Sequence, residues 1–473
     1  MGTYPYPLTW EPEIEKEGGR PVYRAIADAL QRDIAAGALK PGDRLPAQRE
    51  LADFLGVNLT TVTKAFRLGI DRGLLEAAVG RGTYVAARRE EEPLPATRED
   101  NTGGREGLGL IDLGMIHPLY GQNRLIAETV KQVSQRIGIE RYFEYDEPRQ
   151  ARTHRQAGAQ WLRRAGFDTD EESIMVASGS QNALAVTLMS LFHSGDSIGA
   201  DRLTYTGFRN LAEMLGIRLI PVDGDGEGMD PEELARLCRS EGLKGVYLMP
   251  ECQNPTARTL SEERRRSLAS VVERQDLILL EDDHYSFLGN TGLPPVSAYI
   301  PERSVYIAGT SKSLGPGLRI SYMRVAPAFR PAVGRGIYNV NLTTSHFNSE
   351  VAASLIESGA ADRIIALKQA EAESRSLLAD ELLGGWQVMG NQRDYFRFLT
   401  LPAGWTGREF ERAAAAAGVQ VNSGEKFVIG NRPAPAAVRI SLSAARDREE
   451  LGQGLKILRS LLERGPESGP LFV

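Results

Sequence analysis

Cysteine is scarce in this sequence, which contains only Cys238 and Cys252 among its 473 residues. Two cysteines exclude a disulfide framework and a structural zinc site built on cysteine clusters. Long apolar runs are also missing. The longest ones, such as Leu-Ile-Leu-Leu at 277–280, suit buried strands better than membrane spans. The N-terminal residues lack the apolar segment of a signal peptide. These absences favour a reducing, cytoplasmic environment.

The composition is that of a folded protein, with 42% hydrophobic and 25% charged residues, and the length predicts two or three domains. The charge is unevenly distributed. Residues 20–89 contain twelve Lys or Arg and seven Asp or Glu, a net charge of +5, whereas the whole chain carries −6. A basic segment on an acidic remainder predicts different partners for the two parts. Residues 88–108, which are charged and contain Pro and Gly, are predicted to be a linker between domains at 20–87 and 109–473.

Residues 20–87 predict three helices followed by a two-stranded hairpin. Apolar residues at helical spacing mark the first helix, and Gly56 is suited to end the second because glycine tolerates a left-handed turn. Asn58 is placed to cap the third helix. A short helix, a tight turn and a polar helix form a helix-turn-helix, whose second helix enters a DNA major groove. The expected buried stripe of the third helix consists of Val62, Ala65, Phe66 and Ile70.

The other face of this third helix carries polar and basic side chains, namely Thr60, Thr63, Lys64 and Arg67. After the helix, two short predicted strands flank a Gly-Arg-Gly turn and form a wing with Arg81 at its tip. A small protein-interaction module with a solvated basic face would carry similar charge. Charge alone therefore leaves both interpretations open.

The motifs in residues 41–86 separate these interpretations. The Pro-Gly-Asp-Arg-Leu-Pro opening, Arg49, the Thr-Val run and the Gly-x-Gly-Thr wing resemble the winged helix-turn-helix domain of the GntR family over its whole length. The resemblance implies that Arg49, Thr60, Thr63 and Gly82 contact duplex DNA. Leu59 stands where relatives often carry a base-contacting arginine, so the resemblance does not define the operator sequence.

Residues 109–473 alternate apolar strands with helices, which predicts an α/β fold with a mostly parallel sheet. Four strand ends carry polar residues, in Ala-Ser-Gly-Ser-Gln at 177–181, Gln-Asn-Pro-Thr at 253–256, Glu-Asp-Asp-His-Tyr at 281–285 and Thr-Ser-Lys-Ser at 310–313. The carboxyl ends of parallel strands line one crevice. We therefore expect these residues to converge.

The chemistry of this set suits pyridoxal 5′-phosphate. The Lys312 amine forms a Schiff base with the cofactor's aldehyde, and the Asp282 carboxylate keeps the pyridine nitrogen protonated. Asn254 and Tyr285 are expected to donate to the ring's phenolate oxygen, and Tyr205 to stack on the ring. The expected phosphate ligands are Gly179, Ser180, Gln181, Ser311 and Arg319.

Each of these residues also has an ordinary interpretation. The acids at 281–283 would equally form a solvated turn or, less readily, a divalent-metal site, because no second carboxylate cluster stands at ligand spacing. Tyr205 and Tyr285 would serve as interface aromatics. His117 and His284 we interpret as ordinary polar positions. Only the convergence of all of them favours a cofactor, and no metal is expected.

The motifs Glu-Asp-Asp-His-Tyr-Ser-Phe-Leu, Gln-Asn-Pro-Thr and Ser-Lys-Ser-Leu-Gly-Pro-Gly-Leu-Arg resemble the aminoadipate and kynurenine branch of the fold-type I aminotransferases. That resemblance implies that Lys312 is the Schiff-base lysine and that Arg439 grips a substrate α-carboxylate. With the GntR-like head, the whole chain resembles the MocR (GabR-like) regulators. It departs from the pattern at Gly309, where active relatives usually have a serine, and at Ala257, where glycine is usual.

Two functions follow from the resemblance. The first is a transcriptional regulator that senses an amino compound, or pyridoxal 5′-phosphate itself, through the aminotransferase-like domain. The alternative is an active aminotransferase with a DNA-binding head. The intact head favours the regulator, although a residual aminotransferase activity is compatible with either function. The fold also implies a homodimer, with heads that lie over the partner's body.

Overall fold

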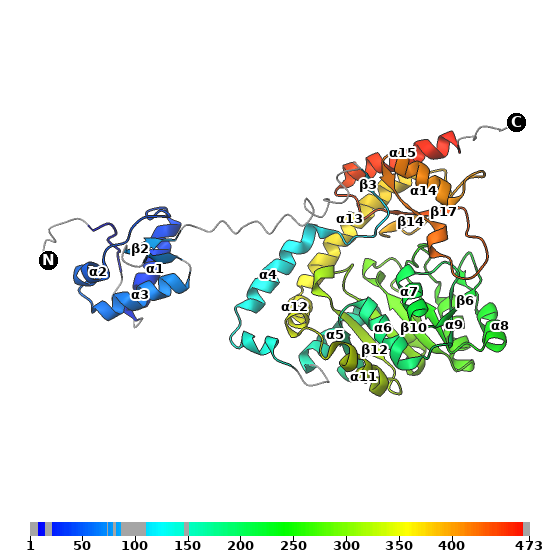
Figure 1. Cartoon of the computed structure of the whole chain (residues 1–473), viewed down its shortest axis with the longest axis horizontal. Coiled ribbons are helices and arrows are strands. Elements are labelled where there is room, and N and C mark those ends of the chain that lie inside the picture. Colours follow the sequence, from blue (N-terminus) through cyan, green and yellow to red (C-terminus); the bar gives the residue numbers. More distant parts are fainter. Residues whose placement is uncertain are drawn as a thin grey trace. The chain divides into compact units, whose positions relative to one another are not determined.

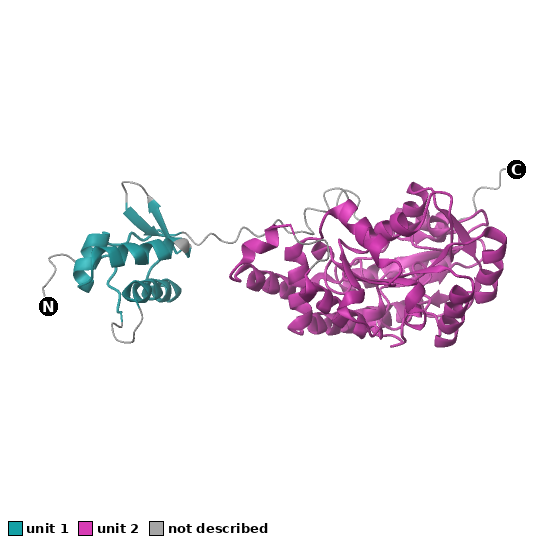
Figure 2. Ribbon diagram, turned by 90° about the horizontal axis from the view of Figure 1, so that it is seen from below, with its two compact units in different colours: residues 1–107 teal, residues 108–473 magenta. Residues whose placement is uncertain are grey.

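The computed structural model describes residues 8–14, 21–72, 74–78, 82–86, 110–145 and 151–466, in two compact units that comprise residues 1–107 and 108–473 (Figure 2). The predicted linker at 88–108 and Arg81 lie outside these described residues. Among the described residues, no helix has the length and apolarity needed to cross a membrane.

Unit 1 is a three-helix domain with a two-stranded wing. Its elements are α1 (Val22–Ala35), α2 (Gln48–Leu55), α3 (Leu59–Asp71), β1 (Leu75–Ala78) and β2 (Gly82–Val85), and the two strands pair antiparallel. Two predicted local signals are present. Gly56 ends α2 at a φ of 59°, and the side chain of Asn58 caps α3 by accepting a hydrogen bond from the Thr60 amide at 2.9 Å.

The buried stripe of α3 differs from the prediction at one position. Val62, Ala65 and Phe66 are buried as expected, but the side chain of Ile70 is 41% exposed. Gly69 faces the core in its place. A Cβ atom at Gly69 would lie 2.9 Å from Leu75 Cδ1, so the wing packs against the helix where a side chain is missing. The assignment of Ile70 to the core was therefore wrong, because the last core contact of the helix is made at Gly69, against Leu75 of the wing.

Unit 2 contains a seven-stranded sheet with helices on both faces (Figure 1). In spatial order its strands are β4 (Ile174–Ala177), β12 (Ser321–Val325), β11 (Ser304–Gly309), β10 (Ile278–Asp283), β9 (Gly245–Leu248), β5 (Ser197–Asp201) and β6 (Arg218–Val222). β12 is antiparallel to both of its neighbours, and the other paired strands are parallel. β12 reverses because it follows β11 through a short connection that carries Lys312. The predicted mostly parallel sheet is confirmed.

Alternate residues of the sheet strands enter different cores. In β11, Val305 and Ile307 pack on one face, whereas Tyr306 and Ala308 pack on the other. The first face is covered by α6 (Ser180–Leu191), α7 (Thr206–Met214) and α11 (Arg330–Asn341). The second is covered by α5 (Arg152–Arg164), α8 (Pro231–Glu241), α9 (Glu262–Arg274), α10 (Val296–Tyr299) and α12 (His346–Glu357). α4 (Asn123–Ser134) packs beside α12, and β7 (Gly224–Asp225) pairs with β8 (Gly228–Met229).

The C-terminal part of unit 2 forms a smaller subdomain. Its antiparallel sheet has the order β13 (Val388–Met389), β14 (Phe396–Thr400), β17 (Ala437–Ser441) and β16 (Asn422–Ser423), packed with α13 (Ala360–Leu383), α14 (Gly407–Ala416) and α15 (Arg448–Arg464). β15 (Val419–Gln420) pairs parallel with β3 (Ile111–Asp112). The residues that enter unit 2 from the linker are therefore attached to the C-terminal subdomain.

Candidate functional site

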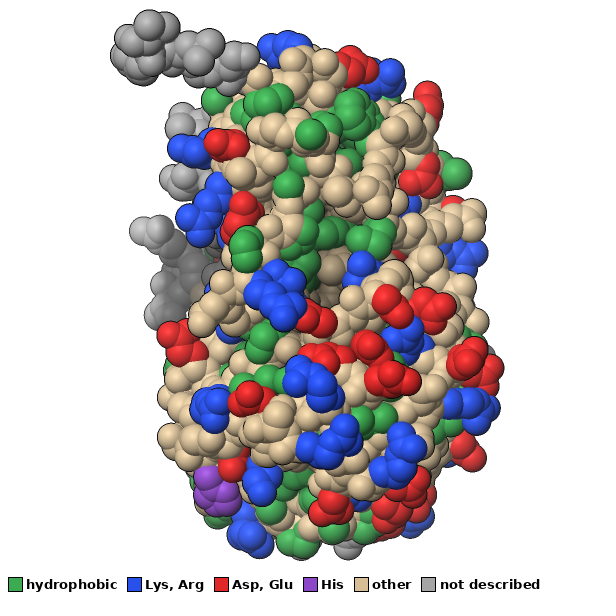
Figure 3. Space-filling model, turned by 90° about the vertical axis from the view of Figure 1, so that its right-hand side faces the viewer, with side chains coloured by type: hydrophobic (Ala, Val, Ile, Leu, Met, Phe, Trp, Pro, Cys, Tyr) green, Lys and Arg blue, Asp and Glu red, His purple; other side chains and the backbone are tan. Residues whose placement is uncertain are grey.

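The candidate DNA-binding residues of unit 1 lie on its surface. Arg49 on α2 is exposed, and so are all four predicted residues of α3, Thr60, Thr63, Lys64 and Arg67. Thr63 donates to Gln48 Oε1 at 2.8 Å, so α2 and α3 are joined at this surface. Gly82 is exposed at a φ of 113°, and Leu59 is 39% exposed at the start of α3. Figure 3 shows one face of unit 2, where acidic and basic side chains are interspersed.

The three acids at the end of β10 point to different environments, because strand side chains alternate. All three are buried, so the interpretation as a solvated acidic turn was wrong. Glu281 accepts from the Val296 and Ser297 amides at the start of α10, and Asp283 accepts from the Tyr306 hydroxyl. Only Asp282 faces the side of α6 and α7. Among the described residues, no group of His, Cys, Asp or Glu could hold a metal ion.

Asp282 is held by two neighbours. Tyr247 donates its hydroxyl to Asp282 Oδ2 at 2.9 Å, and the Tyr247 ring stacks on Phe208 with centroids 3.7 Å apart. His284 Nε2 lies 3.2 Å from Asp282 Oδ1. The prediction had treated His284 as an ordinary polar residue. The two-residue spacing after Asp282 was the available signal, since residues i and i+2 of a strand project to the same face.

A second part of the site lies at the turn from β4 into α6. Gly179 has a φ of 88°, and a Cβ atom there would lie 2.7 Å from Arg319 Nη2. Arg319 donates to Ser178 O at 3.3 Å. Ser180 opens α6, so backbone N–H groups of the first turn point out of this helix end. Gln181 accepts from the Tyr205 hydroxyl at 3.2 Å. The structure thus brings together Gly179, Ser180, Gln181, Tyr205 and Arg319.

Lys312 follows β11 and reaches across the site. Its Nζ donates to the Ile116 carbonyl. Burial lowers the pKa of Lys312 to about 8, and the positive charge of Arg439 acts in the same direction. Ser311 precedes it in the same turn and is half-buried.

A second lysine, Lys368 on α13, lies beneath this turn. It is 1% exposed and donates to Lys312 O at 3.0 Å and to Leu314 O at 2.8 Å. Burial lowers the pKa of Lys368 to about 7. Sequence reasoning missed Lys368, because nothing in the helical pattern distinguishes it from an exposed lysine.

Arg439 on β17 is the cation of the C-terminal subdomain. Its Nη1 donates to Asn254 Oδ1 at 2.6 Å and its Nη2 to Gly114 O at 2.8 Å. The guanidinium lies over the Phe427 ring, 4.8 Å from its centroid. Burial lowers the pKa of Arg439 to about 10, which leaves it charged at neutral pH. Because Asn254 Oδ1 is bonded to Arg439, the amide of Asn254 can offer only Nδ2 as a donor to a ligand.

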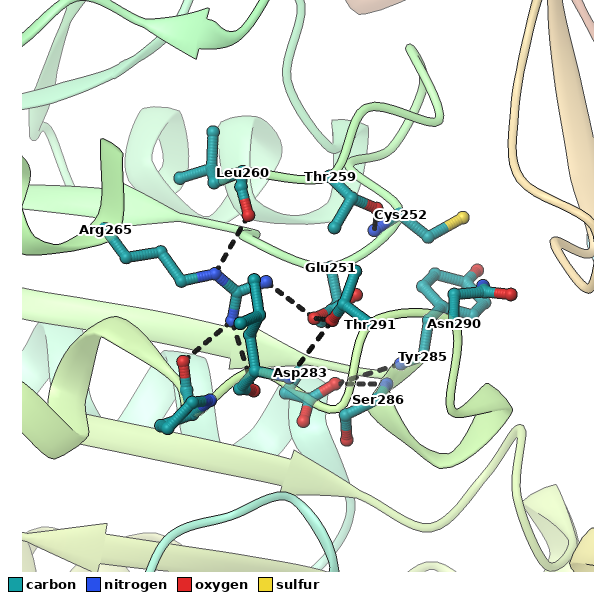
Figure 4. Close-up of polar contacts among 12 residues, drawn as sticks. Glu251, Cys252, Thr259, Leu260, Arg265, Asp283, Tyr285, Ser286, Asn290 and Thr291 are labelled. Atoms are coloured by element: carbon teal, nitrogen blue, oxygen red, sulfur yellow. Dashed lines mark hydrogen bonds and ion pairs between the residues drawn. The ribbon is translucent and has the colours of Figure 1, made fainter. Parts of the chain in front are cut away.

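Tyr285 is buried close to these groups, and burial raises the pKa of its hydroxyl well above the ordinary value. The loops that carry Asn254 and Tyr285 are fixed from behind by a polar network (Figure 4). Arg265 pairs with Glu251 and also donates to the Leu260 and Pro294 carbonyls, while Thr291 donates to Glu251 at 2.6 Å. The positions of the two loops are therefore set by groups outside the site.

The site fits pyridoxal 5′-phosphate by its donor and acceptor set. Ser180 Oγ, His284 Nδ1 and Arg439 Nε are buried and have no hydrogen-bond partner among the described residues. Buried polar atoms are normally hydrogen-bonded. The Asp282 carboxylate matches a pyridinium nitrogen, and the Ser180 hydroxyl at the start of α6, with Arg319 beside Gly179, matches a phosphate.

Comparison with protein families identifies both units. Residues 22–85 match the model of the bacterial regulatory proteins of the gntR family, and residues 109–458 match the aminotransferase class I and II family. The uncharacterized HTH-type transcriptional regulator YdeF of Bacillus subtilis is 37% identical over 460 residues, which cover 97% of this chain and 98% of that protein. The vitamin B6 salvage pathway transcriptional repressor PtsJ of Salmonella typhimurium is 31% identical over 63% of this chain and 66% of its own. The probable rhizopine catabolism regulatory protein MocR of Rhizobium meliloti is 27% identical over 71% of each chain.

Solved structures resemble unit 2. An archaeal alanine:glyoxylate aminotransferase superimposes with a TM-score of 0.71 at 22% identity, and covers 78% of this chain and 94% of its own. The kynurenine aminotransferase of Pyrococcus horikoshii gives a TM-score of 0.70 at 24% identity, with 80% and 96% covered. At these identities the likeness shows the fold. The expected fold-type I aminotransferase architecture is confirmed.

Proposed function

The chain belongs to the gntR-family HTH-type transcriptional regulators of the MocR-like group, which carry a class I and II aminotransferase domain, and we propose that it responds to a small amino compound, or to pyridoxal 5′-phosphate, bound in unit 2. Its function is that of a DNA-binding transcriptional regulator, and its cofactor is pyridoxal 5′-phosphate. The alternative, a physiological aminotransferase, has less support because the relatives with the greatest coverage are regulators. As a DNA-binding protein it would act in the cytoplasm.

The proposed ligands contact three parts of the cofactor, namely its aldehyde, its ring and its phosphate. Lys312 would hold the cofactor covalently, Asp282 would pair with its ring nitrogen, and Asn254 and Tyr285 would donate to its phenolate oxygen. Tyr205 would lie on the ring. Gly179, Ser180, Gln181, Ser311 and Arg319 would surround the phosphate. When bound, the cofactor supplies an aldehyde that condenses with amines and a ring that withdraws electrons.

One observation supports sensing at this site. Lys312 and Arg439 both donate to main-chain carbonyls of the same short segment, Lys312 to Ile116 and Arg439 to Gly114. This segment directly follows β3, which is the first described strand after the predicted linker. Lys312 and Arg439, which would bind an amino compound, therefore also hold the segment of unit 2 that is nearest along the chain to unit 1.

A bound ligand would compete with these contacts. A ligand carboxylate at Arg439 would replace the Gly114 carbonyl as an acceptor. The segment is also held from the C-terminal subdomain, because Asn422 Nδ2 donates to Gly114 O at 2.6 Å and the Leu113 amide donates to Gln420 O at 2.9 Å. Ligand binding would thus shift the segment's contacts between the subdomains. The effect on DNA binding is limited to the ligand's differential affinity for the two states.

We propose that the working form is a homodimer. A dimer would present two winged helices to a repeated or palindromic operator, with heads that are exchanged between the subunits. The segment that follows α4 carries three large apolar side chains that are exposed in the single chain, those of Ile137, Phe143 and Tyr145. Burying them in a subunit interface would remove their contact with water. Sedimentation of the purified chain should give twice the mass of one chain, and a monomer at micromolar concentration would contradict the proposal.

The experiment that tests sensing measures operator binding with and without ligand. Fragments retained by the purified protein are sequenced first, and affinity for the selected duplex is then measured across a set of amino acids and with added pyridoxal 5′-phosphate. We expect Lys312→Ala and Arg439→Met to lose the ligand response while keeping basal DNA binding. Arg274→Ala, at an exposed position on α9, is the matched control and should respond normally. If both site variants keep the full response, unit 2 is not the sensor.

A further inference from the structure

Gly309, the last residue of β11, is enclosed by side chains. A Cβ atom at this position would lie 2.6 Å from His284 Nδ1 and 2.6 Å from Ser180 Oγ, closer than real Cβ atoms approach other heavy atoms. The backbone of Gly309 does not have a positive φ, so its conformation does not demand glycine. The histidine ring and the serine hydroxyl therefore take the space in which a residue-309 side chain would begin.

His284 and Ser180 both direct polar atoms into this space without a partner. Ser180 is 6% exposed, and its Oγ has no hydrogen-bond partner among the described residues. The same holds for His284 Nδ1, whose side chain is 17% exposed. Both atoms lie 2.6 Å from the same point beside Gly309, so they are close to one another, and one oxygen of an anionic group bound next to Gly309 would be within reach of both. Ser180 opens α6 and Gly179 adjoins Arg319, so this space belongs to the proposed phosphate end of the site.

The other edge of the histidine ring explains how it is oriented. His284 Nε2 lies 3.2 Å from Asp282 Oδ1, so the carboxylate orients the ring and leaves Nδ1 toward Ser180 and Gly309. Burial alone would lower the pKa of His284, but the adjacent Asp282 carboxylate outweighs burial and the pKa is raised. A protonated ring has two N–H donors, one for each anion.

We propose that His284 is a phosphate-binding residue of this site, whose Nδ1–H replaces the serine hydroxyl that relatives carry at the position of Gly309. The inference rests on the proposed function, since it requires that pyridoxal 5′-phosphate binds here. The same ring joins the phosphate end of the cofactor site to Asp282, the proposed partner of the pyridine nitrogen. The chain thus lacks a serine phosphate ligand at Gly309 and has a histidine phosphate ligand at His284 instead.

The test compares two ligands that differ only in the phosphate. Dissociation constants of the cofactor-stripped full chain are measured by absorbance and fluorescence for pyridoxal 5′-phosphate and for pyridoxal. A hydrogen bond to a charged group is worth about 1.5–3 kcal/mol, so His284→Ala should weaken pyridoxal 5′-phosphate binding by about ten-fold or more. Pyridoxal affinity should stay nearly constant. Equal losses for both ligands would mean that His284 acts through Asp282 alone, which would overturn the proposal.

A double variant controls for misfolding. His284→Ala combined with Gly309→Ser removes the ring and supplies the hydroxyl. The Ser180 hydroxyl, which also lies 2.6 Å from the new Cβ position, can rotate away, so the double variant should regain most of the affinity for pyridoxal 5′-phosphate. Gly309→Ser alone should lose affinity, because its Cβ meets the histidine ring. Unchanged affinity in His284→Ala, or no recovery in a folded double variant, would contradict the proposal. If the unmodified chain binds pyridoxal but gains nothing from the phosphate, only this inference fails, whereas a chain that binds neither ligand also contradicts the proposed function.

Discussion

Unit 1 and unit 2 place their candidate residues in opposite ways. In unit 1 they are exposed and lie on two short helices and a strand, all within residues 49–82. In unit 2 they are mostly buried and come from segments as far apart as Gly179 and Arg439. The exposed face of a helix can be predicted from the local periodicity of its sequence. A buried site depends on many long-range contacts, all of which must form. The same difference predicts how each unit responds to substitution.

The buried site should show the largest effect, at Lys312. Lys312→Ala should abolish the borohydride-reducible attachment of pyridoxal 5′-phosphate, because the Lys312 amine is the proposed point of attachment. The measurement is peptide mass mapping of the reduced protein, in which the label should appear on the peptide that contains residue 312. Lys244→Ala, at an exposed position, should keep the full label. A label on another lysine would contradict the assignment.

A substitution on the exposed surface of unit 1 should weaken DNA binding without changing the buried site of unit 2. Arg49→Ala should weaken DNA binding about ten-fold and lower the slope of log affinity against log salt by about 0.9, because one phosphate contact is lost. The absorbance spectrum of the bound cofactor should not change. Fluorescence anisotropy at several salt concentrations measures the slope. A changed spectrum, or DNA binding that does not depend on salt, would contradict the prediction that this substitution affects only phosphate contacts of unit 1.

Lys368 predicts a pH effect that is confined to unit 2. Its pKa in the folded chain is about 7, whereas the ordinary value is 10.5, so between these values the unfolded chain binds more protons at this lysine. Stability from this group therefore rises with pH over that window, by at most about 1.4 kcal/mol per pH unit for one proton. Thermal unfolding of Lys368→Met should lack this rise. Lys456→Met, at an exposed position on α15, should retain it.

The smallest expected effect concerns the loop that carries Asn254. Ala257 has a φ of 56°, a conformation that glycine adopts without strain. Ala257→Gly should therefore raise the stability of unit 2 by up to about 1 kcal/mol, since a left-handed non-glycine residue costs about 1–2 kcal/mol and glycine's flexibility offsets part of the gain. Urea unfolding measures the change. A comparable loss of stability would show that the buried Cβ contributes more than the strain costs.

Local rules of the sequence predicted much of this molecule. The cap at Asn58, the left-handed glycine at Gly56 and the two wing strands depend on neighbouring residues, and each is found in the structure. Ile70 shows where local rules end. Helical spacing assigned it to the core, but Leu75 from the wing packs at Gly69 and leaves Ile70 exposed. The helix was predictable, and its exact buried face was not.

The sequence by itself determined the two-domain organisation, the alternation of strands and helices, and the residue types that suit the cofactor, because these follow from periodicity, charge and motif. Tertiary structure alone decided what surrounds those residues. It paired Glu281 with the amides at the start of α10 and Asp283 with the Tyr306 hydroxyl, placed Lys368 under the Lys312 turn, and brought the Gly114 carbonyl to Arg439 across 325 positions of the chain. It also put the His284 ring into the space beside Gly309. The physical reason is that a side chain's partners are set by the packing of distant elements, which local propensity does not encode.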